Sequence, residues 1–350
     1  MKTLARAAAL VLVATACYAQ VVASIDGAVE TQVQAKKFMG TVLVARGEEV
    51  LFSKGYGDAN IEWGIANAPS TKFRLGSITK QFTAASVLLL EERGKLTVTD
   101  LIKTHLPEAP ATWAGITIHH LLTHTSGIPN FTAAPDYRAS MTLPTTAEQT
   151  IARFREKPLD FAPGSKMSYS NSGYVVLGAI IEKVSGVSYA TFVEENVFKP
   201  AGMKDSGYDS NTAIIPRRAA GYSASPAGMD NASYLHMTIP FSAGALYSTT
   251  EDLLRWNLAL FGGRILSAAS LAKMTTPALN NYALGVSVRT INGRKVVQHN
   301  GGISGFNTFL SYYPESRITI AVLANLNGPA ADLLGPQLGA IAHGETSTKP

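Results

Sequence analysis

The chain has 350 residues, of which 46% are hydrophobic and 16% charged, and its formal net charge at pH 7 is +5. This composition is typical of a compact globular protein, and it excludes a disordered chain or a disulfide-stapled mini-protein. Lysine and arginine are scattered along the sequence, without a basic cluster that also holds aromatic residues, so nucleic acid is not an expected partner.

The N-terminal segment 1–19 has the features of a secretory signal peptide. Lys2 and Arg6 precede an apolar run that is shorter than the roughly 20 residues of a membrane span, and small residues follow it. We expect cleavage after Ala19, which leaves a cysteine-free mature domain over 20–350 in the periplasm or outside the cell. The alternative is a lipoprotein signal with a lipid anchor on Cys17. Elsewhere the sequence predicts no membrane span.

The mature domain is expected to begin with two strands between Gly40 and Gly57, joined by a glycine-containing turn. Helical patterns dominate the middle of the chain, at 77–92, 118–123, 146–155, 172–184, 189–197 and 250–260. Strand patterns return at 284–290, 295–299, 306–313 and 317–323, before a final helix at 330–342. Asn292-Gly293, between the first two of these strands, is a strong hairpin signal.

Strands at both chain ends with helices between them predict an α+β fold. We expect one antiparallel sheet, built from both ends of the chain and flanked by helices, with an inserted and mostly helical lobe. The sheet lobe is expected over about 25–75 and 240–345, and the helical lobe over about 76–239. The active site is then expected at the junction of the two lobes.

Ser77 and Lys80 open a long apolar helix with the spacing Ser-x-x-Lys. Residues i and i+3 lie on the same face of a helix, so Lys80 can direct its amine at the Ser77 hydroxyl. A serine hydroxyl is a poor nucleophile until a neighbour removes its proton, and a lysine whose pKa is lowered by burial can do so. Taken alone, the pattern is more often a helix N-cap serine followed by a solvated lysine.

Two further segments carry candidate site residues. Tyr169 and Asn171 follow a Pro-Gly loop and precede the helix at 172–184, where side chains can face a reaction centre, although caps and core residues of these types are common there. His299-Asn300-Gly301-Gly302 is expected to end a strand. Paired glycines allow close backbone approach and free N–H groups, as an oxyanion donor or a substrate-binding edge requires, but a plain glycine-rich loop also fits.

In this order, Ser-x-x-Lys at 77–80, Tyr-x-Asn at 169–171 and His-x-Gly at 299–301 resemble the three motifs of the penicillin-recognising serine hydrolases. That family includes DD-peptidases, class C β-lactamases, D-aminopeptidases and related esterases. The resemblance extends from Gly40 to Asn327 and includes the runs 73–77 and 120–127. It implies the family's β-lactamase/DD-peptidase-like fold, which agrees with the predicted order of strands and helices.

By this resemblance Ser77 is the catalytic nucleophile that becomes acylated. Lys80 is either its base or the cation that lowers the pKa of Tyr169, and Tyr169 relays the proton. Asn171 binds the acyl-side amide of the substrate. No metal and no cofactor is implied.

The same resemblance assigns His299, Gly301 and Gly302 to substrate binding. Gly301 leaves room for substrate, and the backbone N–H groups of Ser77 and Gly302 form the oxyanion hole. His299 stands where many members have lysine. Since histidine is largely neutral above a pKa of about 6.5, we expect weak binding of carboxylate substrates that improves, relative to neutral esters, as pH falls.

Two features outside the three motifs also concern metal and substrate binding. His120 and His124 have the i, i+4 spacing of a metal pair, but the acidic residue of a His-Glu-x-x-His motif is missing, so we expect them to pack this loop against the helical lobe. Phe131, in the loop that follows, is expected to overhang the site and contact substrate, with plain packing as the alternative.

The implied chemistry is acyl transfer through a covalent acyl-enzyme on a small-molecule or peptidoglycan-peptide substrate. A DD-peptidase-like activity is expected first, of the D-Ala-D-Ala carboxypeptidase or D-aminopeptidase type. The alternatives are a class C-like esterase or β-lactamase, and a penicillin-binding sensor that is acylated without turnover. A carboxypeptidase also needs a cation for the terminal carboxylate, and Arg289 and Arg294 are near His299 in sequence.

Overall fold

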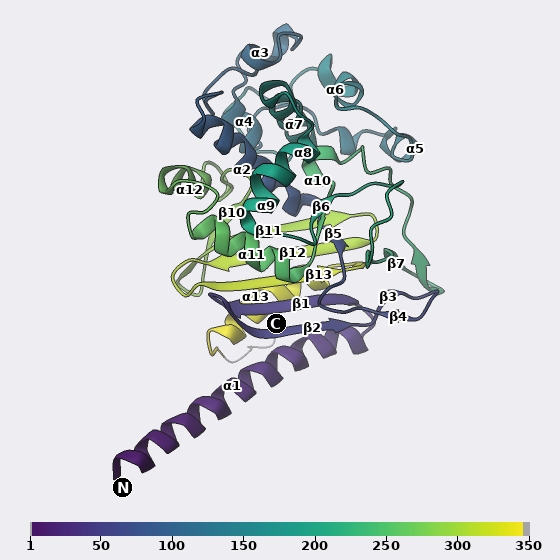
Figure 1. Cartoon of the computed structure of the whole chain (residues 1–350). Helices are drawn as coiled ribbons and strands as arrows, with labels where there is room; N and C mark the ends of the chain where they lie inside the picture. Colours follow the sequence, from purple (N-terminus) through teal and green to yellow (C-terminus); the bar gives the residue numbers. More distant parts are fainter. Residues whose placement is uncertain (1, 346–350) are drawn as a thin grey trace.

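The computed structural model describes residues 2–345, with side chains described from Tyr18 onward. A six-stranded antiparallel sheet lies at its centre, with the strand order β10-β11-β12-β13-β1-β2 (Figure 1). The strands are β1 (Gly40–Arg46), β2 (Glu49–Tyr56), β10 (Ser287–Ile291), β11 (Arg294–Ile303), β12 (Phe306–Tyr313) and β13 (Ile318–Ala324). Because β1 pairs with β13, the two ends of the chain meet in one sheet, which confirms the predicted fold class.

Helices cover both faces of this sheet (Figure 1). On one face lie α1 (Lys2–Gln34) and α13 (Ala330–Ala342), and on the other face lies α11 (Thr250–Phe261). The other helices are α2 (Thr79–Glu92), α3 (Ile102–His105), α4 (Ile118–Leu122), α5 (Tyr137–Ser140), α6 (Ala147–Arg155), α7 (Asn171–Ser185), α8 (Tyr189–Val193), α9 (Lys199–Ala201), α10 (Phe241–Gly244) and α12 (Ala268–Met274).

Shorter elements connect these helices to the sheet. The 3-10 turns are η1 (Gly76–Ile78), η2 (Ala111–Trp113) and η3 (Phe131–Ala133), and η4 (Glu194–Phe198) is a π-helical segment. The short strands are β3 (Asp58–Asn60), β4 (Ile65–Ala66), β5 (Phe73–Arg74), β6 (Gly207–Tyr208), β7 (Tyr222–Ser225), β8 (Gly228–Asn231), β9 (Leu246–Ser248) and β14 (Leu326–Asn327). Among them, β5 pairs with β9 and leads directly into η1.

The central strand β1 is buried on both faces because it separates two hydrophobic cores. Successive side chains of a strand point to opposite faces. Val42 and Val44 therefore pack in the core that α1 and α13 close, while Leu43 and Ala45 pack in the core that includes α2 and α11. The sheet is thus held between helices on both sides, which gives the elements around η1 a rigid base.

Most predicted elements are present with shifted ends, and two of them differ in kind. The helix predicted at 77–92 begins with the 3-10 turn η1, and the one predicted at 189–197 ends in the π-helical segment η4. The predicted strand 295–299 is longer than expected. The turn to β12 is made by Ser304 and Gly305, so pairing continues to Ile303 and the two glycines lie inside β11 rather than at its end.

The helix α1 was not predicted beyond the signal segment. It continues to Gln34, and Ile25 and Val29 are fully buried under the sheet. Lys54 of β2 binds Asp26 at 2.7 Å and Glu30 at 3.3 Å. Within residues 2–345, no single helix is both long and apolar enough to cross a membrane. One pair, α7 with the helical segment Tyr189–Ala201, is long and apolar enough when taken together, but it is bent by 79°.

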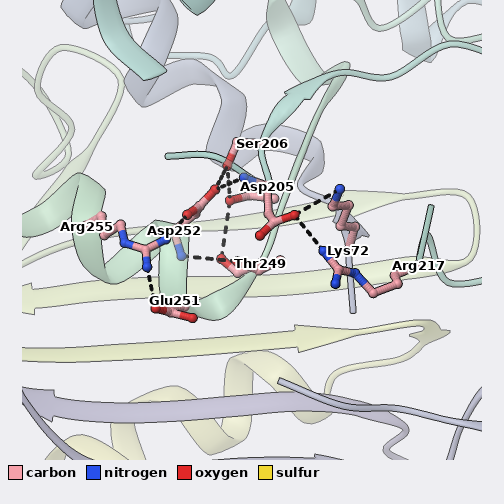
Figure 2. A network of polar contacts seen from close by, with 9 residues as sticks. Lys72, Asp205, Ser206, Arg217, Thr249, Glu251, Asp252 and Arg255 are labelled. Carbon is pink, nitrogen blue, oxygen red and sulfur yellow. Dashed lines mark hydrogen bonds and ion pairs between the residues drawn. The ribbon is translucent and has the colours of Figure 1, made fainter. Parts of the chain in front are cut away.

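A polar network holds the chain that leads into the site (Figure 2). The carboxylate of Asp205 binds Lys72 at 3.1 Å and Arg217 at 2.9 Å, so it connects two segments that are far apart in sequence. Asp252, in the first turn of α11, accepts hydrogen bonds from the Asp205 N–H at 2.7 Å and the Ser206 hydroxyl at 2.8 Å. The network therefore ties the chain entering β5 to α11.

The same segment contributes Asp209, a fully buried carboxylate between two arginines. Arg74 of β5 donates to Asp209 at 2.6 Å, and Arg218 binds its other oxygen. Removing one partner of a buried ion pair leaves the other charge without compensation, and this costs more than the pair contributes. Asp209 therefore anchors the strand that ends three residues before Ser77.

We expect Asp209→Ala to lower the free energy of unfolding by about 3 kcal/mol, since it leaves two partly buried guanidinium groups unpaired. The matched control is Asp205→Ala. The Asp205 carboxylate is one-third exposed, so its removal should lower the free energy of unfolding by about 1 kcal/mol or less. Urea unfolding followed by circular dichroism measures both. Equal losses in the two variants would contradict the assigned role of Asp209.

Candidate active site

Ser77 lies in η1, where the end of β5 meets the start of α2. The N–H of Leu75 donates to Leu246 O at 2.8 Å, which fixes the strand just before the turn. Gly76 has a φ of +54°, and a Cβ at this position would lie 3.0 Å from Gly302 N, so only glycine fits easily. No side-chain hydrogen bond caps η1 or α2, so Ser77 is not acting as a helix cap.

Lys80 is fully buried one helical turn after Ser77. Its Nζ lies 3.0 Å from Ser77 Oγ, 2.9 Å from Asn171 Oδ1 and 2.8 Å from Ala243 O. Burial lowers the pKa of Lys80 well below the ordinary value of 10.5. A neutral amine has two N–H donors and one lone pair. It can therefore donate to Asn171 and Ala243 and accept the proton of Ser77.

Tyr169 places its ring beside this amine, with Lys80 Nζ 4.8 Å from the ring centroid. Burial of the hydroxyl raises the pKa of Tyr169, and a hydrogen bond with Ser77 opposes this increase. The tyrosine is therefore neutral when Lys80 is neutral. Of the two roles that the sequence left open for Lys80, this arrangement favours the base over a cation that stabilises a tyrosinate.

Asn171 is the first residue of α7, and its side chain lies between Lys80 and Thr132 of η3. Its Oδ1 accepts from Lys80, and its Nδ2 donates to Thr132 Oγ1 at 3.1 Å. Asn171 also lines the cavity beside Ser77. Since Nδ2 has two N–H donors, the second can bind a substrate carbonyl. Asn171 therefore both orients Lys80 and faces the substrate.

His299 lies behind the site, which corrects its predicted contact with substrate. The residue is only 4% exposed and does not line the cavity. Its Nδ1 donates to Asn300 O at 2.5 Å, and its Nε2 accepts from the Tyr282 hydroxyl at 3.0 Å. Burial, together with the nearby Lys80, lowers the pKa of His299 to about 3. The ring is therefore neutral near pH 7, and both of its nitrogens are occupied.

The two glycines of β11 have different roles. A Cβ at Gly301 would lie 2.0 Å from Leu75 O, so this glycine lets β11 approach the chain before Ser77, which corrects its predicted role of leaving room for substrate. Gly302 borders the cavity together with Ser77, and its N lies beside Gly76. β10 pairs with β11 only as far as Gln298, so no strand covers this edge. The arrangement suits the predicted oxyanion hole.

The cavity beside Ser77 has a volume of about 230 Å³. None of its lining residues carries a formal charge; they are Gly76, Ser77, Phe131, Thr132, Tyr137, Met141, Asn171, Leu235, Pro240, Ala243, Gly244, Gly302, Ile303 and Ser304. Arg289 and Arg294 are not among them, and Arg294 instead binds Glu345. Hence neither arginine that was near in sequence supplies a cation here.

Phe131 both packs in the core and borders the cavity. It is 3% exposed and stacks against Phe154 with a centroid distance of 6.1 Å, so most of the ring is packed in the core. It also contributes to the cavity wall. Phe131 can therefore contact a bound substrate, but it does not overhang the site.

Sequence reasoning missed the aromatic cluster behind Tyr169. The ring centroid of His124 lies 4.2 Å from Tyr169, 5.0 Å from Tyr174 and 4.7 Å from Tyr282. Tyr282 comes from a loop without periodic pattern, so the sequence held no signal for it. The sequence predicted only that His124 packs its loop against the helical lobe, with a metal pair as the disfavoured alternative. In the described part of the chain, no group of three or more metal-ligating side chains is assembled.

The family model described as Beta-lactamase matches residues 25–343. The chain belongs to the beta-lactamase family. Members of this family are serine hydrolases that act by acyl transfer, and the constellation of Ser77, Lys80 and Tyr169 described above has the groups that such chemistry requires. The three motifs on which the resemblance rested are thus brought to one place.

Among the relatives of this beta-lactamase family protein, "Penicillin-binding protein 4*" of Bacillus subtilis is 31% identical over 318 residues, which cover 85% of this chain and 70% of the relative. The structure of an octameric penicillin-binding protein homologue from Pyrococcus abyssi has a TM-score of 0.82 and 29% identity, covering 92% of this chain and 77% of that one. A D-stereospecific amidohydrolase from Streptomyces has a TM-score of 0.77 and 26% identity, covering 94% and 99%.

We expect Tyr169→Phe to slow acylation of Ser77 by about 10²–10⁴-fold, the range typical of a lost general acid–base group. The ring contacts with Lys80 and His124 remain, so thermal stability should change little. Stopped-flow hydrolysis of p-nitrophenyl acetate measures the acylation rate. Turnover close to that of the wild type would mean that Lys80 exchanges the proton without a tyrosine relay.

The burial of His299 removes the pH dependence expected from the sequence. Since its pKa is lowered to about 3, the ring does not gain a proton between roughly pH 5 and 8. We expect the ratio of penicillin to p-nitrophenyl acetate acylation rates to be flat over this range. A ratio that rises as pH falls would show that His299 becomes charged and contacts the carboxylate.

Proposed function

We propose that this protein is a secreted hydrolase of D-aminoacyl amides and peptides that forms an acyl-enzyme on Ser77. The observation that carries the proposal is the uncharged cavity beside Ser77, walled by apolar groups such as Tyr137, Met141 and Leu235. The names of two relatives support the substrate class, since one is a penicillin-binding protein and another a D-stereospecific amidohydrolase.

In the proposed reaction the Lys80 amine takes the proton of Ser77 as Oγ attacks the substrate carbonyl carbon. The N–H groups of Ser77 and Gly302 stabilise the oxyanion that forms. The C–N bond then breaks, and the departing nitrogen receives a proton through Tyr169, which leaves an acyl-enzyme and a free amine. In the second half-reaction water attacks the ester carbonyl and gives a proton to the same groups. The bond between the acyl carbon and Ser77 Oγ then breaks, Oγ takes up that proton and the acid is released.

The lack of charged residues in the cavity wall bears on whether a carboxypeptidase is the favoured activity. A D-Ala-D-Ala carboxypeptidase must desolvate a terminal carboxylate beside the scissile bond, which is costly without a cation. Among the described lining residues none is cationic, and Lys80 is below the cavity in its neutral form. The proposal therefore favours the amidase type, acting on amides and peptides without a charged group beside the scissile bond. Small neutral esters are the second candidate, because they too carry no charge that the cavity wall would have to compensate.

The test compares acetyl-D-Ala-D-Ala amide with acetyl-D-Ala-D-Ala as the free acid, two substrates that differ only in the terminal charge. We expect kcat/KM to be at least about tenfold higher for the amide, which corresponds to 1.4 kcal/mol. Acetyl-L-Ala-L-Ala amide serves as the stereochemical control. A preference for the free acid would overturn the proposed substrate class in favour of a carboxypeptidase.

A covalent probe tests the nucleophile independently of the substrate. A fluorophosphonate should add a single adduct at Ser77, and Ser77→Ala should lose both the adduct and all hydrolysis. Ser304 also lines the cavity and is therefore the informative competitor. Labelling of Ser304 in the wild type would overturn the assignment of Ser77.

Secretion is part of the proposal and rests on the charge and apolar pattern of residues 1–19. Cleavage after Ala19 would leave the half of α1 whose side chains pack on the sheet, with Ile25 and Val29 in place. The intact mass of the exported protein tests this, since an N-terminus at Gln20 is expected. A lipid-modified N-terminus at Cys17 would instead support the lipoprotein signal.

A further inference from the structure

His124 contacts three consecutive residues around Tyr169. Its carbonyl oxygen accepts from the Ser168 N–H at 2.9 Å, and its Nδ1 accepts from the Ser170 N–H at 3.2 Å. Between these two hydrogen bonds, its ring packs on the ring of Tyr169 with a centroid distance of 4.2 Å. The His124 side chain therefore holds the Ser170 N–H and the tyrosine ring, while its main-chain carbonyl holds the Ser168 N–H on the other side of Tyr169.

The surroundings of His124 fix its orientation. The residue is 2% exposed and has a φ of +58°, a left-handed backbone conformation that is uncommon for histidine. Since Nδ1 accepts a hydrogen bond, the proton of the neutral ring is on Nε2, which is buried and has no hydrogen-bond partner. The backbone conformation belongs to the end of α4, where His124 follows the C-cap Thr123 and the Thr125 N–H donates to His120 O at 2.9 Å. Helix capping does not explain the buried Nε2, which has no partner among the described residues, and such groups in native structures call for an explanation.

Tyr169 depends on this contact because the residue is not fully enclosed by the fold. The residue is 37% exposed, and the other aromatic neighbours are more distant, with Tyr282 and His299 both at centroid distances of 6.3 Å. His124 is thus the nearest aromatic ring behind Tyr169. A rotation of the tyrosine would move its hydroxyl away from Ser77, and displacements of about 1 Å at a reacting group can cost 10²-fold in rate.

We infer that His124 is a positioning residue, which holds the Tyr169 ring in the direction that places its hydroxyl at Ser77. This inference rests on the proposed role of Tyr169 in proton transfer. His124 itself touches neither the cavity nor Ser77, so it acts only through Tyr169 and the Ser168–Ser170 backbone.

The chain offers a matched control for a purely structural effect. His120 is four residues earlier, and its Nδ1 also accepts a backbone N–H at 3.2 Å, from Thr117 at the start of α4. This histidine does not contact Tyr169 or the cavity. His120→Phe and His124→Phe therefore remove the same kind of hydrogen bond, but only the second removes one beside the catalytic tyrosine.

The experiment measures kcat and KM for p-nitrophenyl acetate in wild type, His124→Phe, His124→Asn and His120→Phe, each normalised to the fraction of Ser77 that reacts with a fluorophosphonate. Asparagine tolerates the left-handed backbone and keeps an acceptor for Ser170, so His124→Asn is expected to fold even if His124→Phe does not. We expect kcat to fall by about tenfold or more in each folded His124 variant, with KM within about twofold, and to be unchanged in His120→Phe.

A double-mutant cycle with Tyr169→Phe decides whether His124 acts through the tyrosine. If it does, His124→Asn should have no further effect on kcat once the Tyr169 hydroxyl is absent. Independent losses that multiply, or a folded His124→Asn enzyme with the kcat of wild type, would overturn the inference. The reporter ester needs no D-aminoacyl group, so a wild type that hydrolyses it but not D-alanyl amides would refute the proposed substrate class alone.

Discussion

The buried amine of Lys80 is the interaction on which the site depends. Its three partners, Ser77 Oγ, Asn171 Oδ1 and Ala243 O, are all uncharged oxygens. A charged ammonium group in such surroundings has no counterion to offset its desolvation, whereas a neutral amine can use all three contacts. The packing of α2, α7 and α10 around this one nitrogen therefore selects the protonation state that a base requires.

Other features of the fold protect this arrangement. Gly76 and Gly301 bring β11 against the chain that carries Ser77, and Asp209 holds that chain through Arg74. On the opposite side, the loop after α4 binds the segment that carries Tyr169 and Asn171, through His124 and Asn130. The proton path thus lies between the sheet edge and a loop that binds the Ser170 and Asn171 N–H groups directly.

Local patterns explain why much of this could be predicted from the sequence. The apolar run of β1 and the hairpin at Asn292-Gly293 depend on neighbouring residues, and the three motifs follow from their own short spacings. His299 was misjudged because its environment is set by Tyr282, which reaches it from a loop without regular pattern. The role of His124 was missed for the same reason, since its contacts with residues 168–170 are made only when the chain folds. The helix of residues 20–34 was overlooked because it follows the signal segment without a cap or break.

The state of Lys80 can be measured directly by NMR titration of the protein labelled with ¹³C and ¹⁵N in its lysine side chains, with Lys80→Met to assign the signal. The account predicts that the Lys80 signal titrates at a pH below that of the surface lysines, because burial lowers its pKa. In Asn171→Ala the pKa of Lys80 should change more than in a distant control such as Lys273→Met, because Lys80 loses its contact with Asn171 Oδ1. A Lys80 that titrates with the surface lysines, or above them, would contradict the assignment of a neutral amine as the base for Ser77.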